Sequence, residues 1–161
     1  MAVLKKLTFE QALFKAQAIC SRQEKCGQDI IQKLFDWKVE KSLHSKIIKS
    51  LKDENYINEE RYASSFVKDK LSFNKWGIIK IRYALLLKNI PEKLIDNALN
   101  EIDEQTYDHI LKEELLKKLK SLKERDEYIV KSKLVQYALS KGFENGKVFD
   151  MVSEIQKSTK K

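Results

Sequence analysis

Apolar residues recur at spacings of three and four along almost the whole chain, and only four glycines and one proline interrupt them. Residues spaced in this way share one face of an α-helix, whereas a half-buried strand needs strict alternation, which no stretch shows. Tight-turned sheets, dinucleotide-binding folds and phosphate-binding loops need glycine where the backbone bends sharply or approaches a ligand. The 161-residue chain is therefore predicted to be all-α.

Helix start and stop signals divide the chain into nine expected helices. Thr8 and Gln11 form a capping box, in which each side chain pairs with the backbone of the other residue. Asn58 is a second N-cap, Thr106 is expected to open the longest helix, and Gly142 to end another in left-handed conformation. The expected helices span residues 9–21, 27–37, 43–54, 59–71, 76–88, 92–102, 107–123, 126–141 and 145–156.

A threefold repeat accounts for this number of helices. Val39, Ile90 and Phe143 each follow a second helix, and they are separated by 51 and 53 residues. Five residues before them stand three further apolar residues, which are Leu34, Leu85 and Ala138. We therefore predict an elongated, curved array, right- or left-handed, of three tandem three-helix repeats, while a single irregular helical domain is the alternative. The predicted repeats are 1–55, 56–104 and 105–161.

Composition limits the cellular setting. The chain is 42% hydrophobic and 35% charged, which is too apolar for disorder and too charged for a membrane span. Uncharged apolar runs such as Tyr83–Leu87 fall far short of the roughly 20 residues that a spanning helix needs. Two cysteines cannot form a disulfide framework, and no apolar signal-peptide core follows Lys6. We expect a cytoplasmic protein without a membrane partner.

The net charge of +8 is unevenly distributed. Between residues 66 and 90 six residues are basic and only Asp69 is acidic, whereas residues 53–60 and 92–104 are rich in acids. The basic residues of this stretch are Lys68, Lys70, Lys75, Lys80, Arg82 and Lys88. Such a patch can neutralise phosphates or complement an acidic protein groove, and it can equally be a solvated helix face.

Two residues near this patch have more than one interpretation. If buried, Trp76 would anchor the turn before Gly77; if exposed, it would be a candidate hot spot of an interface. We expect it to be partly buried. Arg61 could contact a partner or form an ion pair within its own helix.

No residues form a recognisable catalytic or metal-binding pattern. Cys20 and Cys26 are six residues apart, and the only histidines, His44 and His109, are remote from them and from each other. Many carboxylates are present, but nothing in the sequence singles out a pair for acid–base chemistry. We expect neither an enzyme nor a bound metal or cofactor.

The middle of the chain contains two stretches with a specific pattern. From Leu51 the sequence reads LKDENYINEERYASSFVKDKL, and from Phe73 it reads FNKWGIIKIRYALLLKNIPEKLIDNAL. They resemble the RecX family, bacterial regulators of the RecA recombinase. The family's first piece is matched by Leu51, Asn55, Tyr56, Ile57, Asn58, Glu59, Glu60, Arg61, Tyr62 and Ala63. Its second piece is matched by Gly77, Lys80, Ile81, Leu85, Lys88, Asn89 and Ile90.

The resemblance extends over residues 8–155 and is strongest over 51–99. The upstream stretch ICSRQEKCGQDIIQKL is similar to the family's first unit, with Cys26 in place of Ser. Asn55 and Asn89 replace family glycines, which is a mild change because Asn is the next-best residue in left-handed conformation. The family fold consists of three tandem three-helix repeats, in agreement with the repeat found above.

The resemblance implies a non-enzymatic modulator that binds RecA in the groove of its filament on single-stranded DNA. There it would restrain ATP hydrolysis, strand exchange and filament growth. The alternative is a basic helical nucleic-acid-binding protein that acts on DNA directly, and weak binding to single- or double-stranded DNA would suit both. From charge and placement, we expect the partner contacts to be Arg61, Lys68, Lys75, Trp76, Lys80 and Arg82.

Overall fold

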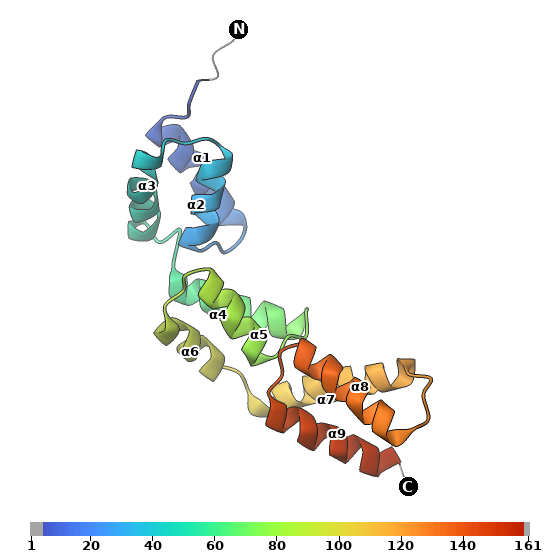
Figure 1. Cartoon of the computed structure of the whole chain (residues 1–161). Helices are drawn as coiled ribbons and strands as arrows, with labels where there is room; N and C mark the ends of the chain where they lie inside the picture. Colours follow the sequence, from blue (N-terminus) through green and yellow to red (C-terminus); the bar gives the residue numbers. More distant parts are fainter. Residues whose placement is uncertain (1–4, 160–161) are drawn as a thin grey trace.

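The computed structural model describes residues 5–159, which form nine α-helices and no β-strand. This confirms the all-α prediction. The helices follow one another in an elongated, bent array (Figure 1). We refer to α1–α3 as repeat 1, α4–α6 as repeat 2 and α7–α9 as repeat 3. The helices are α1 (Phe9–Arg22), α2 (Gly27–Asp36), α3 (Lys41–Asp53), α4 (Glu59–Ser72), α5 (Ile78–Leu87), α6 (Glu92–Asn100), α7 (Glu104–Ser121), α8 (Glu127–Ser140) and α9 (Asn145–Thr159).

Most expected helix starts are confirmed, but three are wrong by two or three residues. Helix α3 begins at Lys41, with Glu40 as its N-cap, two residues earlier than predicted. The capping box of Thr8 and Gln11 is present, and the Asn58 side chain accepts a hydrogen bond from the backbone of Arg61. Helix α7 begins at Glu104 because Asp103, not Thr106, is its N-cap; the Asp103 carboxylate accepts bonds from both the backbone and the hydroxyl of Thr106. Helix α5 begins two residues later than predicted, since the residues before Ile78 are used to contact repeat 3.

The three repeats share the turn that follows their second helix. In each, the backbone N–H of the anchor residue donates to the carbonyl five residues earlier, which caps the helix end. The pairs are Val39 with Leu34, Ile90 with Leu85, and Phe143 with Ala138. The residue before each anchor has a positive φ: Lys38 at 57°, Asn89 at 60° and Gly142 at 94°. The repeat spacing read from the sequence therefore corresponds to one recurring backbone motif.

The buried side chains form two separate cores. Repeat 1 has its own, which includes Ile30, Leu34 and Ile47. Repeats 2 and 3 share a second, continuous core. Among the buried residues that the structure describes, Cys26 is the one from repeat 1 that belongs to this second core. Residues 1–55, 56–104 and 105–161 remain our proposed repeat boundaries.

Candidate partner-binding surface

Repeats 2 and 3 meet through direct contact of their backbones. The Gly77 N–H donates to the Lys141 carbonyl at 2.8 Å, and the Ile79 N–H donates to the Gly142 carbonyl at 3.0 Å. A Cβ atom on Gly77 would overlap the backbone of Gly142, and one on Gly142 would lie 2.7 Å from the Lys80 nitrogen. Two of the four glycines of the chain are thus required where two repeats touch.

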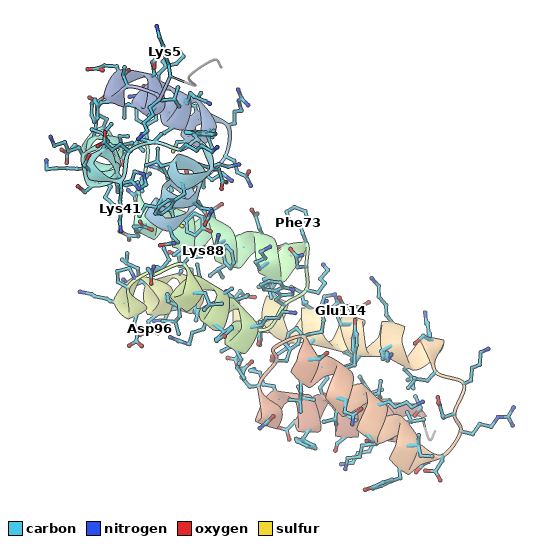
Figure 2. All side chains as sticks on the ribbon, turned by 45° about the horizontal axis from the view of Figure 1, so that its top comes forward. Lys5, Lys41, Phe73, Lys88, Asp96 and Glu114 are labelled. Carbon is cyan, nitrogen blue, oxygen red and sulfur yellow. The ribbon has the colours of Figure 1, made fainter. Side chains whose placement is uncertain are left out.

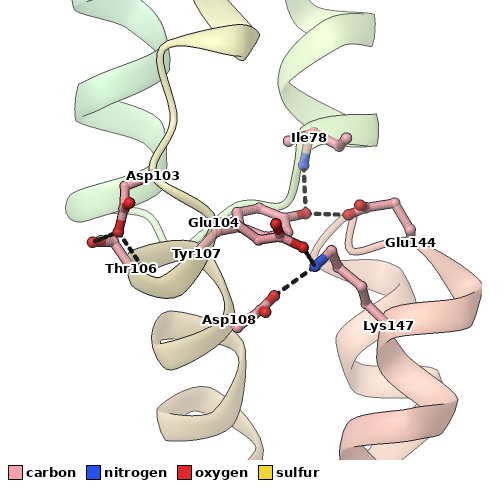
Figure 3. A network of polar contacts seen from close by, with 8 residues as sticks. All are labelled: Ile78, Asp103, Glu104, Thr106, Tyr107, Asp108, Glu144 and Lys147. Carbon is pink, nitrogen blue, oxygen red and sulfur yellow. Dashed lines mark hydrogen bonds and ion pairs between the residues drawn. The ribbon is translucent and has the colours of Figure 1, made fainter.

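Tyr107, at the start of α7, completes this junction (Figure 3). Its hydroxyl accepts a hydrogen bond from the Ile78 N–H at 3.1 Å and donates one to Glu144. Burial and the hydrogen bond to Glu144 together raise the pKa of Tyr107, so the phenol stays neutral. Nearby, Lys147 pairs with Asp108 at 2.7 Å. The Tyr107 hydroxyl therefore connects three segments, which are the first turn of α5, the first turn of α7 and the turn before α9.

Repeats 1 and 2 meet through charged and polar side chains. Arg61 pairs with Glu24 of repeat 1 and also donates to the Asn55 and Tyr56 carbonyls. A second contact has its donor in repeat 1: the Gly27 N–H donates a hydrogen bond to Glu59 Oε1 of repeat 2 at 3.0 Å. Arg61 therefore joins two repeats, whereas the sequence suggested a partner contact or an ion pair within one helix.

A second ion pair joins Asp29 of repeat 1 to Lys88 of repeat 2. Lys88 is labelled in Figure 2. Partial burial opposes ionisation of Asp29, but hydrogen bonds from Lys88 and from the Cys26 N–H outweigh it and lower the pKa of the carboxyl. Asn89 adds a bond to Gln28 at 2.9 Å. Burial raises the pKa of the Cys26 thiol to about 11, so this residue is an inert apolar contact.

Trp76 is half-buried, as expected, and packs between two lysine side chains. The Lys70 ammonium lies 4.8 Å from the indole ring centre, and that of Lys80 lies 4.6 Å from it. Lys75 precedes Trp76 in left-handed conformation, with a φ of 58°. We call Lys70, Lys75, Trp76 and Lys80 the Trp76 cluster. Within residues 5–159, none of its three lysines forms an ion pair with a carboxylate.

The other expected contact residues lie apart from this cluster. Lys68 is exposed on α4, beside a groove that it lines with Leu71, Ala98 and Glu101. Arg82 pairs with Asp96 of α6 at 2.7 Å, on the outer side of repeat 2 (Figure 2). The structure thus brings together Lys75, Trp76 and Lys80, adds Lys70, and separates Arg61, Lys68 and Arg82 from them.

Sequence reasoning placed Lys70 in the basic patch but not among the contact residues, and it missed the exposed apolar side of α5. The position of Lys70 six residues before Trp76 gave no sign of contact, because the chain reverses between them and the Trp76 N–H donates to the Lys70 carbonyl. The apolar side of α5 did leave a signal. Eight of the ten residues of this helix are apolar, more than one face of a small repeat can bury.

The described residues hold no arrangement that suggests metal chemistry or membrane insertion. Across residues 5–159, no group of three or more His, Cys, Asp and Glu side chains could hold a metal ion. His44 is buried in repeat 1, with its Nε2 atom 3.0 Å from the Val39 carbonyl oxygen. No helix in the same part of the chain combines the length and apolar character needed to cross a membrane.

Comparison with known proteins places these features in a family. Residues 58–99 match the family model described as RecX, second three-helix domain. A protein of Clostridium botulinum (strain Eklund 17B / Type B), named Regulatory protein RecX, is 37% identical over 112 residues, which cover 68% of this chain and 52% of the relative. One of Clostridium acetobutylicum with the same name is 26% identical over 145 residues, covering 88% and 67%. The chain belongs to the RecX family.

A solved structure supports the same assignment at the level of the fold. A crystal structure of regulatory protein RecX superposes with a TM-score of 0.79 at 26% identity, over 90% of this chain and 74% of that chain. The three-helix repeats described here are therefore those of the RecX family. The chain spans about half to two thirds of the length of the curated relatives it matches.

Proposed function

We propose that this chain is a cytoplasmic, non-enzymatic regulator that binds the RecA recombinase filament on single-stranded DNA and restrains its ATP hydrolysis, strand exchange and growth. One observation carries the proposal: the family match falls on repeat 2, the repeat that also carries the unpaired lysines of the Trp76 cluster. The partner follows from the resemblance of residues 51–99 to regulators of RecA.

The geometry supports binding to a repetitive partner. An elongated array of repeats offers surfaces far enough apart to contact neighbouring subunits of one filament. Contacts made by one linked body reinforce each other through a high effective concentration. Lysines without carboxylate partners complement an acidic protein surface and accelerate association with it. No cofactor or metal enters this proposal.

DNA-dependent ATP hydrolysis by preformed filaments of the RecA from the same organism tests the proposal directly. We expect the rate to fall as the chain is added. An unchanged rate at several-fold excess of this chain over RecA would reject the proposal. If the rate of ATP hydrolysis falls only because the chain removes DNA from the filament, the result would favour the alternative, a protein that acts on DNA itself.

Charge reversal of the Trp76 cluster refines this test. The double variant Lys70→Glu and Lys80→Glu is expected to weaken filament binding with no loss of helicity, and the matched control is Lys41→Glu with Lys46→Glu on the exposed side of α3. Equal binding by the two variants would show that the cluster is a solvated face. The salt dependence of binding to DNA alone estimates how many phosphates the chain contacts.

A further inference from the structure

Helix α5 buries one side and exposes large apolar side chains on the other. Ile81 and Leu85 are fully buried in the core of repeats 2 and 3. Away from them, four large apolar side chains are 39–64% exposed, which are Ile79, Tyr83, Leu86 and Leu87. With about 100° of rotation per residue, these four lie within a sector of about 100° around the helix axis. We call them the α5 stripe.

Charged residues border the α5 stripe without interrupting it. By the same helical rotation, Arg82 lies at one edge of the sector and Lys80 at the other. Arg82 is paired with Asp96, whereas Lys80 belongs to the Trp76 cluster. The stripe is therefore a continuous apolar line, with free positive charge along one edge.

Contacts at both ends of α5 hold the stripe in its exposed position. At the first turn, the Ile79 N–H donates to the Gly142 carbonyl of repeat 3. Just after the last turn, Lys88 pairs with Asp29 and Asn89 bonds to Gln28, both in repeat 1. Since the two ends are tied to different repeats, the helix cannot rotate to bury the stripe without breaking both junctions.

Such a line of apolar side chains fits a second helix. Contiguous exposed apolar surface on a folded protein marks an interaction site. Side chains at positions i, i+4, i+7 and i+8 are those through which one helix packs against another. Nucleic acid fits less well, because three of the four side chains are aliphatic and offer no ring face on which a base could stack.

The charges around the stripe define the chemistry of that second helix. The edge near the start of α5 carries the Trp76 cluster, whose lysines form no ion pair within residues 5–159. At the far end, Leu87 lines a groove with three lysines and two carboxylates, which are Lys25, Lys33, Lys88, Asp29 and Asp36. Of these, Asp29 is paired with Lys88. A complementary helix thus carries carboxylates beside the first half of α5, while beside its last turn this chain itself supplies part of the negative charge.

We propose that the α5 stripe binds an amphipathic helix of the RecA protein itself, with Asp or Glu residues flanking its apolar side. This inference rests on the proposed function and names the contact surface and the chemistry of the segment that it takes. The apolar line supplies the affinity, while the Trp76 cluster fixes the direction in which the helix lies along α5.

The test compares two full-chain variants with the unmodified chain on RecA filaments. The stripe variant carries Ile79→Ser, Tyr83→Ser and Leu87→Ser; the control carries Phe14→Ser and Tyr128→Ser, which replace side chains 73% and 81% exposed in repeats 1 and 3. Removing three anchors from one interface is expected to raise the concentration for half-maximal inhibition by more than about tenfold. The control is expected to stay within about twofold, and circular dichroism verifies that both variants keep their helices.

A photoreactive benzoylphenylalanine at position 83 identifies what covers the stripe. We expect a crosslink to RecA protein, within a segment that has helical apolar spacing and flanking carboxylates. A crosslink to the DNA, or to a second copy of this chain, would overturn the inference. The inference would also be overturned if the stripe variant inhibited the filaments as strongly as the control variant does. If the unmodified chain has no effect on filaments, the proposed function fails first, so the two failures are distinguishable.

Discussion

The two junctions between neighbouring repeats are built from different interactions. Repeats 2 and 3 share one apolar core and touch backbone to backbone, with Gly77 against Gly142. Repeats 1 and 2 have separate cores except for Cys26, which reaches from repeat 1 into the second core. They meet mainly through pairs of charged side chains, which are Arg61 with Glu24 and Lys88 with Asp29. Backbone contact and apolar burial are insensitive to salt and pH, whereas ion pairs at half-exposed positions are not.

Because the two junctions differ in this way, the resistance of the array to opening is not uniform along its length. We expect repeats 2 and 3 to behave as one body and repeat 1 to be the more easily displaced. Two glycine amides report on the junctions separately. The Gly27 N–H bonds to Glu59 across the first junction, and the Gly77 N–H bonds to Lys141 across the second. Hydrogen exchange at these amides measures how often each junction opens.

The largest effect is expected from Gly142→Ala. The new methyl group would clash with the backbone of Lys80, and the residue would keep a φ of 94°, which strains any side chain. We expect a loss of roughly 3 kcal/mol or more in the free energy of unfolding, measured by denaturant titration. Gly146→Ala is the control, since nothing lies within 4 Å of its added Cβ. Equal effects of the two substitutions would show that the backbone contact is unimportant.

The next largest effect is expected from Arg61→Ala, which breaks the first junction. The Glu24 carboxylate loses its partner, and two carbonyls of the α3–α4 connection lose a donor. Because Arg61 is partly exposed, we expect a cost of about 1–2 kcal/mol. Exchange of the Gly27 amide should accelerate, with the Gly77 amide unchanged. Arg22→Ala, at an exposed position of α1, is the control, and acceleration at Gly77 as well would contradict two independent junctions.

A smaller, reversible effect is expected at low pH. The pKa of Asp29 is lowered from its ordinary value of 3.8, so its pair with Lys88 stabilises the folded state fully above that value. This contribution is lost as the pH falls through the lowered pKa of the folded state. Exchange of the Gly27 amide, corrected for its intrinsic rate, should therefore rise in acid more than exchange of the Gly77 amide. In Lys88→Met, this difference in pH dependence should shrink; if it persists, Asp29 is not its source.

The smallest effects are expected at two left-handed residues. Lys38→Gly relieves a φ of 57° at a turn within repeat 1 and should stabilise the chain by about 0.5 kcal/mol. Asn89→Gly relieves a similar φ but removes the hydrogen bond to Gln28 across the first junction, so its net effect should be near zero. Thermal unfolding compares the two, and equal stabilisation would show that the Asn89 bond contributes nothing.

Much of the fold could be predicted because its signals are local. A helix cap acts within three or four residues, and the turn before each of Val39, Ile90 and Phe143 depends on a single left-handed residue. The error at α7 was also local, since Asp103 is a better acceptor at a helix start than Thr106, three residues later.

The candidate site could be predicted only in part. Charge clustering pointed to Lys75, Trp76 and Lys80, which do lie together. It could not separate them from Arg61 and Arg82, because a charged residue looks the same in a sequence whether it is free or paired. The pairing of Arg61 with a glutamate 37 residues away depends on how two repeats dock, and one sequence carries no record of that.

The sequence by itself determined nine helices, their grouping in threes and the residues buried at each turn, since these follow from spacing and capping over a few residues. The tertiary structure decided which charged side chains form ion pairs between repeats, where two distant glycines meet, and which side of α5 remains exposed. Those features arise from the docking of whole repeats, whose geometry is set by many side chains at once and by no local pattern.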